Sequence, residues 1–140
     1  MSEIHSHKCP GSKAAQSKYR VAARSKRTDD DGIVYDSALE MKRMYELEES
    51  KRLGEITEYL YHVRVRLGDI VYETDFMVIG PRSTINRECS LYPVWFEDVK
   101  GVETPSFRRV RKLWPKYMKL TLMILKRGRY GWEREMIHGK

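Results

Sequence analysis

The stretch from Tyr92 to Gly101 constrains the fold most, because it is typical of a buried strand that ends in an acid and a lysine. Successive side chains of a strand point to opposite faces, so Asp98 and Lys100 share one face, whereas Glu97 lies on the other. Burying either charge without a partner is costly. The remainder of the chain must therefore bring suitable partners to this strand end.

The length of 140 residues suits one hydrophobic core. We expect a single domain over residues 29–140, preceded by a basic, flexible N-terminal arm over residues 1–28. Cys9 and Cys89 lie far apart and indicate a reducing compartment. The chain has no apolar run of signal-peptide or membrane-spanning length, so the sequence predicts a soluble cytoplasmic protein.

The net charge of +7 is unevenly distributed. Residues 1–27 hold seven basic groups and one acid, residues 101–140 hold eleven and three, and residues 28–100 hold nine and sixteen. This pattern favours a polyanion bound by the two ends and divalent cations held by the acidic centre. The alternative is a soluble basic protein in which this pattern has no functional meaning.

Two clusters of basic residues are predicted to contact DNA phosphates. In the arm they are Lys18, Arg20, Arg24, Lys26 and Arg27, and on the second helix they are Arg108, Arg109, Arg111 and Lys112. The segment from Lys126 to Arg129 suits the same role. A solubilising tail is the alternative for the arm.

A first helix is predicted from Asp36 to about Leu53, with a Ser cap and a Gly just beyond its end. Glu40 shares a face with the apolar residues Met44 and Leu47. It also lies three residues after the Ser cap, where a capping-box Glu bonds back to the helix start. Both a capping role and a role in a site on the apolar face remain open for Glu40.

A β-hairpin is predicted from Leu60–Leu67 and Ile70–Ile79, joined by a two-residue turn. Strict alternation would place every second residue from Tyr61 to Leu67 on one face. On the return strand, alternation places Asp75 among apolar neighbours, where it needs a hydrogen-bond donor or a cation.

The C-terminal half continues with a polar loop over Gly80–Leu91 and, after the Tyr92 strand, a second helix that begins near Thr104-Pro105. Pro115 is expected to end or kink this helix. Its apolar side carries Phe107, Val110 and Trp114. The apolar run Leu120–Leu125 is typical of a buried strand, and the pattern assigns no structure to the segment that follows.

The element order of helix, three strands, helix and strand resembles the PD-(D/E)xK nuclease superfamily. Thr74-Asp75 stands where this family has Pro-Asp, Asp98-Val99-Lys100 matches its acid-x-Lys motif, and Glu40 matches its helical acid. The resemblance covers roughly residues 33–127 and is greatest to small phage and bacterial endonucleases near the Holliday junction resolvases. It implies an α/β fold with a restriction-endonuclease-like core (αβββαβ), in which helices flank a central mixed sheet.

The resemblance also implies a chemistry, namely metal-dependent hydrolysis of DNA phosphodiester bonds. Asp75, Asp98, Glu40 and the carbonyl of Val99 would hold Mg²⁺, or Mn²⁺ in its place, and Lys100 would orient the attacking water or stabilise the transition state. The geometric expectation is that Asp75, Asp98 and Lys100 converge at one sheet edge while Glu40 approaches from the helix.

The substrate implied by the resemblance is branched or junction DNA, cut by a homodimer, since a symmetric junction calls for twofold symmetry. Two alternatives stay open. In the first, the protein binds nucleic acid without catalysis, and the acids and Lys100 form a buried salt bridge. In the second, the enzyme is a DNA end-processing exonuclease of the same fold.

Overall fold

The structure is a computed structural model that describes residues 21–84 and 90–140. In chain order the elements are the 3₁₀ helix η1 (Arg24–Arg27), α1 (Ala38–Arg52), β1 (Glu58–Leu67), β2 (Ile70–Ile79), β3 (Ser83–Thr84), β4 (Ser90–Leu91), β5 (Val94–Val99), α2 (Pro105–Tyr117), β6 (Thr121–Arg127) and β7 (Trp132–Ile137). The predicted order of helix, three strands, helix and strand is present as α1, β1, β2, β5, α2 and β6, so this part of the sequence prediction is confirmed.

A five-stranded mixed sheet with the strand order β1-β2-β5-β6-β7 forms the centre of the α/β fold. The pairs β1–β2, β2–β5 and β6–β7 are antiparallel, whereas β5 and β6 are parallel. The parallel pair is joined through α2, because parallel neighbours need a crossover connection. The β5 end that carries the acid-x-Lys motif therefore lies beside the corresponding end of β6.

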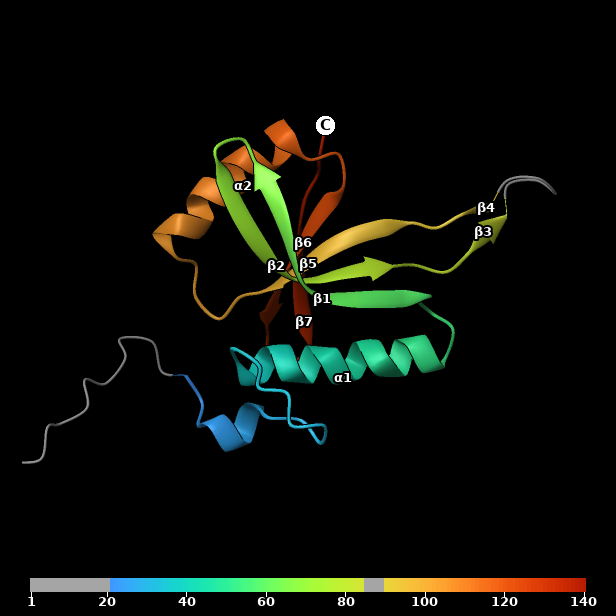
Figure 1. The fold of residues 1–140 in the computed structure, drawn as a ribbon, viewed down its shortest axis with the longest axis vertical. Helices are drawn as coiled ribbons and strands as arrows, with labels where there is room; N and C mark the ends of the chain where they lie inside the picture. The colour runs from blue at the N-terminus through green and yellow to red at the C-terminus, as the bar shows by residue number, and fades with distance from the viewer. Residues whose placement is uncertain (1–20, 85–89) are drawn as a thin grey trace, which may run out of the picture.

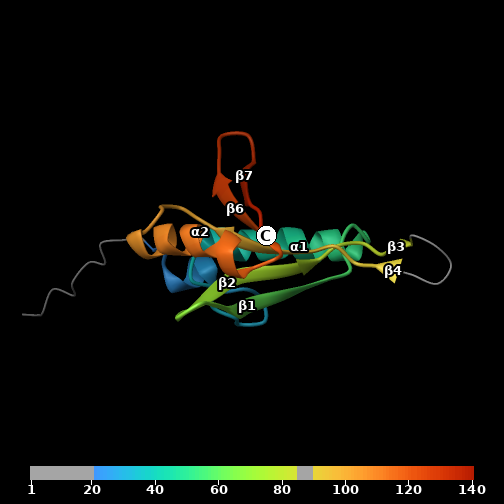
Figure 2. The same ribbon diagram turned by 90° about the horizontal axis from the view of Figure 1, so that it is seen from above.

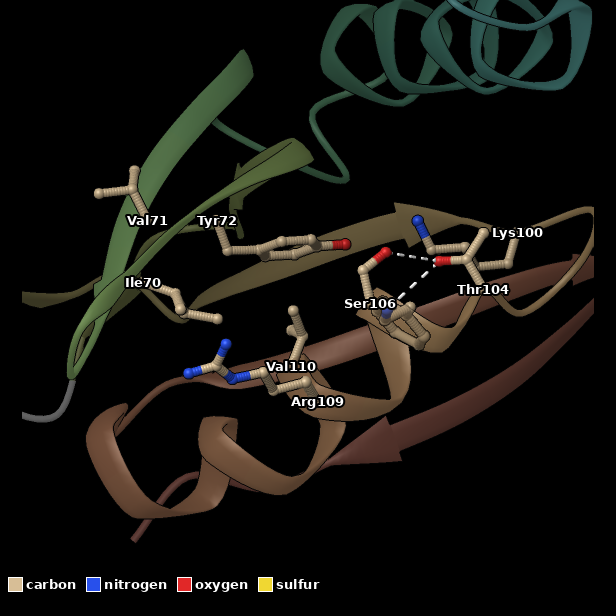
Figure 3. A pocket seen from close by; sticks show the side chains of 9 residues that line it. Ile70, Val71, Tyr72, Lys100, Thr104, Ser106, Arg109 and Val110 are labelled. Atoms are coloured by element: carbon tan, nitrogen blue, oxygen red, sulfur yellow. Dashed lines mark hydrogen bonds between the residues drawn. The ribbon is translucent and has the colours of Figure 1, made fainter.

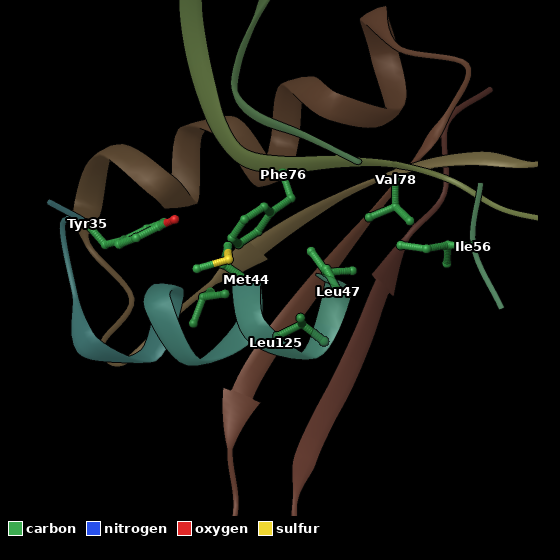
Figure 4. Packing of buried hydrophobic residues seen from close by; sticks show 8 residues of the cluster. Tyr35, Met44, Leu47, Ile56, Phe76, Val78 and Leu125 are labelled. Carbon is green, nitrogen blue, oxygen red and sulfur yellow. The ribbon is translucent and has the colours of Figure 1, made fainter. Parts of the chain in front are cut away.

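The two helices cover opposite faces of the sheet, which gives three layers (Figure 1). Met44 and Leu47 of α1 pack against Phe76 and Val78 of β2, as Figure 4 shows. On the other face the predicted apolar side of α2 packs against Leu67 and other sheet residues. Thr104 caps α2 by accepting a hydrogen bond from the backbone N–H of Phe107, at 3.2 Å.

The β1–β2 hairpin bends halfway along its length, and the expected strict alternation is wrong there. Tyr61 packs in the α1 layer, whereas Val63 and Leu67 pack in the α2 layer. His62 between them has a φ of 53°, in the left-handed region that L residues seldom adopt. This backbone reversal shifts the later side chains to the other face. Tyr72 on β2 consequently faces the α2 layer.

Other differences are found at chain segments with weak sequence signals. The polar loop before β5 contains a short antiparallel ribbon, β3–β4. Pro115 lies inside α2, which continues to Tyr117 rather than ending at the proline. The unassigned C-terminal segment forms the edge strand β7, which pairs with β6 from Leu122↔Ile137 to Arg127↔Trp132.

Residues 21–28 of the expected arm lie against the start of α1. The backbone N–H of Tyr35 donates to the carbonyl of Arg27 at 2.8 Å, and Thr28 forms a β-bridge with Val34. Within residues 21–84 and 90–140, neither helix is both long and apolar enough to cross a bilayer.

Candidate active site

The candidate site forms where β5 ends beside β2. The register Phe76↔Glu97 continues to Asp75 opposite Asp98, so these two side chains start from the same face of neighbouring antiparallel strands. The backbone N–H of Val99 donates to Oδ2 of Asp75 at 2.6 Å. The pairing of β2 with β5 therefore brings together two acids that lie far apart in the sequence.

Asp98 is fully buried and has one satisfied and one unsatisfied oxygen. Its Oδ2 accepts from the Lys100 ammonium at 2.8 Å and from the Tyr72 hydroxyl. Its Oδ1 has no hydrogen-bond partner in the part of the chain that the structure describes. A buried carboxylate oxygen without a donor is costly, and a cation would satisfy it.

Lys100 follows β5 directly and is mostly buried, with 21% of its side chain exposed. Its Nζ lies 4.7 Å from the centre of the Phe107 ring at the start of α2. The aromatic face and the Asp98 carboxylate together fix the position of the ammonium. The backbone N–H of Lys100 donates to the carbonyl of Leu125 at 2.8 Å, which anchors this strand end on β6.

Glu40 reaches the site from the first turn of α1 and is buried, with 6% exposure. Its backbone N–H donates to the Ser37 hydroxyl at 3.1 Å, which caps the helix. Its carboxylate accepts from the Ser37 hydroxyl at 3.2 Å and from the Tyr61 hydroxyl at 3.3 Å. Burial raises the pKa of Glu40, and the negative charge of Asp36 raises it further. The cap and the inward-facing carboxylate thus coexist.

The pKa of Asp75 reflects both its burial and the charges of neighbouring residues. Burial raises the pKa of Asp75 well above its usual value, and the charges of Asp98 and Glu40 add to this increase. The Lys100 charge and the Val99 N–H act in the opposite direction. Asp98 and Asp75 therefore both interact with the Lys100 ammonium, and Glu40 adds further negative charge that acts on Asp75.

Glu97 lies outside this cluster, as the strand pattern predicts. Its carboxylate accepts two hydrogen bonds from Arg43 of α1, at 2.7 and 2.8 Å, and one from the Trp95 indole N–H at 2.9 Å. It is 1% exposed. Glu97 is thus paired within the α1 layer, whereas Asp98 faces Tyr72 and Lys100.

Several residues near the site were not among the sequence candidates. Tyr72 and Tyr61 donate to Asp98 and Glu40, and the side-chain ligand atoms of Asp36, Glu40 and His62 lie within 4.8 Å of one another. His62 lies within β1, is partly exposed, and stacks on Tyr61 with 3.7 Å between ring centres. The strand pattern places Tyr72 on the face opposite Asp75, so its contact with the site could be predicted only if the bend in the hairpin were already known.

Two hollows adjoin Lys100. One, of about 330 Å³, lies between β2 and the start of α2 and is lined by Tyr72, Thr104 and Val110 among others; Figure 3 shows it with the Tyr72 ring extending across it. The other, of about 340 Å³, lies between residues 21–22, the first turn of α1 and the chain that follows β5, and Glu40 and Val99 line it. Lys100 therefore lines both hollows.

The predicted DNA-contacting residues differ in their surroundings. Lys18 and Arg20 lie outside the described residues. Arg24 and Lys26 are exposed, whereas the Arg27 guanidinium donates to the carbonyl of Tyr35.

On α2 the exposed basic face is reduced by ion pairs with neighbouring acids. Arg109 pairs with Asp69 at 3.0 Å, and Arg111 pairs with both Glu103 and Glu135. The residues Arg108 and Lys112 are exposed and form no ion pair with any described residue.

Carboxylate oxygens are the ligands that Mg²⁺ and Mn²⁺ prefer, and Glu40, Asp75 and Asp98 carry them. Among the described residues, the group whose ligand atoms all lie within 4.8 Å of one another is nevertheless Asp36, Glu40 and His62, and not the predicted set of Glu40, Asp75 and Asp98. The structure shows Val99 donating its N–H to Asp75, and the metal-binding role predicted for its carbonyl stays a prediction.

Comparison with known proteins yields no relative. No protein-family model, curated protein or solved structure matches the chain. The function proposed below accordingly follows from the geometry of the site and from the sequence.

Proposed function

We propose that the protein is a metal-dependent deoxyribonuclease that hydrolyses phosphodiester bonds. The observation that carries this proposal is the pair of acids Asp75 and Asp98 on neighbouring strands, with the Lys100 ammonium bonded to Asp98 and with Glu40 acting on Asp75 from α1. The order of α1, β1, β2, β5, α2 and β6, with β6 parallel to β5, further favours a restriction-endonuclease-like core.

A purely structural salt bridge accounts poorly for this cluster. A buried Asp98–Lys100 pair would balance one positive and one negative charge. Asp75 adds a further acid beside this pair, Glu40 adds another that acts on Asp75, and one oxygen of Asp98 has no donor among the described residues. A protein stabilised by the ion pair alone would gain nothing from these additional acids, because each raises the cost of burial.

Bound Mg²⁺ would lower the pKa of a coordinated water and neutralise charge that develops on the phosphate. Asp75 and Asp98 would hold this cation from neighbouring strands, and Glu40 would complete the acidic wall from α1. Both strand acids are fixed before any ligand arrives, because Val99 holds Asp75 and Lys100 and Tyr72 hold Asp98. Such prior positioning lowers the cost of reaching the productive geometry.

Lys100 would act on the substrate through its remaining ammonium protons. One hydrogen bond goes to Asp98, and a phosphate oxygen or the attacking water would approach Lys100 from one of the two hollows that it lines. A compact ammonium can donate to both at short range. Lys100 would thereby orient the nucleophile and stabilise the negative charge of the transition state.

DNA is the substrate that the charge distribution favours. The basic residues of α2 and of η1 suit contacts with the backbone, which carry little sequence information. We further propose selectivity for branched DNA and a homodimeric enzyme, by resemblance to the Holliday junction resolvases. A monomer that cuts linear single strands as readily as four-way junctions would contradict this selectivity.

Cleavage of an end-labelled four-way junction, with Mg²⁺ or with EDTA, tests the proposed activity. We expect cleavage only with the metal, and we expect Asp98→Asn to abolish cleavage while DNA binding is retained. Glu49→Gln is the matched control, since Glu49 is an exposed acid on α1 whose ion-pair partner among the described residues is Arg52. Equal product from wild type and Asp98→Asn would refute the proposal, and a ladder of progressively shortened ends would indicate the exonuclease alternative.

A further inference from the structure

The tip of the β6–β7 hairpin consists of a cationic and an aromatic residue. The backbone N–H of Gly128 donates to the carbonyl of Gly131 at 2.9 Å, which leaves Arg129 and Tyr130 as the two residues of the turn. Gly131 has a φ of +150°, which favours glycine at this position. The Tyr130 side chain is 92% exposed. The hairpin projects from the body of the protein (Figure 2).

One arginine lies beside each of two aromatic rings of this hairpin, and the Glu133 side chain lies against Gly128 at the turn. The Arg129 guanidinium lies 5.5 Å from the ring centre of Tyr130, and the Arg127 guanidinium lies 5.6 Å from that of Trp132. Neither arginine forms an ion pair within residues 21–84 and 90–140. The tip therefore presents free positive charge beside an aromatic face, the combination that binds single-stranded nucleic acid through phosphates and stacked bases.

The strand pairing places this tip near the candidate active site. Lys100 is hydrogen-bonded to Leu125 of the parallel strand β6, and β6 continues from there into the turn. Only five residues separate Leu125 from Tyr130, so the tip lies within about 18 Å of Leu125. This distance corresponds to roughly five base pairs of duplex. A DNA bound at Lys100 would thus reach the hairpin tip.

We propose that Tyr130 stacks on an unpaired base beside the cleavage site, while Arg127 and Arg129 hold the flanking phosphates. The location relative to Lys100 matters only if the proposed nuclease function holds, so this inference rests on that function. Bases within a duplex are already stacked on both sides, whereas a base at a branch or bulge has a free face. Tyr130 thereby selects distorted DNA without reading its sequence.

Binding without cleavage separates this proposal from the proposed catalysis. The probes are two duplexes that differ by one unpaired 2-aminopurine, titrated with the full chain in EDTA. We expect Tyr130→Ala to weaken binding of the bulged duplex by roughly tenfold and to change binding of the paired duplex by less than about twofold. Tyr130→Phe keeps the ring and should retain wild-type binding and the quenching of 2-aminopurine fluorescence. Because the side chain is exposed, both variants should fold.

Equal weakening of both duplexes, or wild-type binding by Tyr130→Ala, would overturn the stacking role. Failure of the wild type to prefer the bulged duplex would overturn it as well. Mg²⁺-dependent cleavage that survives alongside either result would leave the nuclease proposal intact. Selective loss of bulge binding in a protein that cleaves no DNA would instead support the stacking role and refute the nuclease.

Discussion

Asp98 combines complete burial with incomplete pairing. Lys100 and Tyr72 satisfy one of its oxygens, and the other has no partner among the described residues. At the neighbouring position, Glu97 has three hydrogen bonds from Arg43 and Trp95. Asp98 and Glu97 are therefore equally buried, but only Asp98 has an oxygen without a hydrogen-bond partner among the described residues. Substituting each acid in turn should separate a role in the site from a role in stability.

Lys100→Met should slow single-turnover cleavage of a junction by about 100-fold or more, because a donor to the transition state is lost. The dissociation constant for DNA should change by less than about threefold. The substitution also leaves Asp98 buried without a counter-charge, so the free energy of unfolding should fall by about 3 kcal/mol. Adding Asp98→Asn should restore stability in urea titrations without restoring cleavage. If the Asp98–Lys100 pair is purely structural, the wild-type protein itself should not cleave DNA.

Glu97→Gln should produce the opposite pattern. The substitution leaves the largely buried Arg43 without its charged partner, and we expect a loss of about 3 kcal/mol in the free energy of unfolding. Below the lowered melting temperature, cleavage per folded molecule should stay within about threefold of wild type. Circular dichroism melting and kinetics measured on the same preparation test this expectation. Loss of cleavage in a fully folded Glu97→Gln protein would place Glu97 in the site instead of Asp98.

The sequence predicts the charged residues of this cluster because each stands out from an apolar pattern. Asp75 lies within an apolar strand, and Asp98 and Lys100 share the face that alternation assigns to them. Tyr72 could not be predicted, because regular alternation directs it away from Asp75. Its contact with Asp98 depends on the bend of β2, which is a tertiary effect.

At the scale of elements, the bend in the β1–β2 hairpin decides how the site is assembled. His62 occupies the left-handed region and stacks on Tyr61, which in turn donates to Glu40. On the opposite strand, the Thr74 hydroxyl donates to the carbonyl of Val63 at 3.0 Å. The bend thus connects the sheet directly to the acid on α1.

His62→Val should destabilise the fold by about 1–2 kcal/mol relative to His62→Asn. Both variants lose the imidazole, but a β-branched residue tolerates a positive φ poorly whereas asparagine adopts it readily. Urea titrations of the two proteins measure the difference. Equal stabilities would show that His62 does not hold a left-handed conformation in solution.

The start of each helix can be predicted from the local sequence, whereas the edge strands of the sheet cannot. Ser37 and Thr104 are the observed helix caps, and the predicted range Ile70–Ile79 coincides with β2. The edge strand β7 is polar and largely exposed along most of its length, so no periodicity marks it. Its formation depends on pairing with β6, which only the assembled sheet provides.

For the whole molecule, the uneven charge of the sequence does not translate directly into the charge of the surface. Among the described acids of residues 28–100 only Glu40, Glu97 and Asp98 are buried, so most of these acids lie at or near the surface beside the basic residues. Ion pairs with neighbouring acids occupy Arg109 and Arg111, whereas Arg108 and Lys112 have none within the described residues. The net charge alone could not predict this division, since it depends on which acids lie beside α2 in the folded protein.

Arg108→Ala combined with Lys112→Ala should weaken duplex binding. The slope of log K against log salt concentration should become less steep by about two, because about two fewer counterions are released on binding. Fluorescence anisotropy in EDTA over a series of salt concentrations gives this slope. Arg64→Ala is the control, because Arg64 is an exposed arginine already paired with Glu73 at 2.8 Å. An unchanged slope in the double variant would show that Arg108 and Lys112 of α2 do not contact DNA phosphates.

The hydrogen bond from Val99 to Asp75 makes one backbone amide a reporter of the site. Val99 donates to a side chain, whereas the next amide, Lys100, donates to the backbone of β6. A cation bound by the other oxygen of Asp75 would hold this carboxylate on the Val99 amide, whereas the Lys100 amide keeps the same backbone partner with or without metal. We therefore expect Mg²⁺ to slow hydrogen–deuterium exchange at Val99 relative to Lys100. Two adjacent amides would then reveal metal occupancy with neither DNA nor catalysis present.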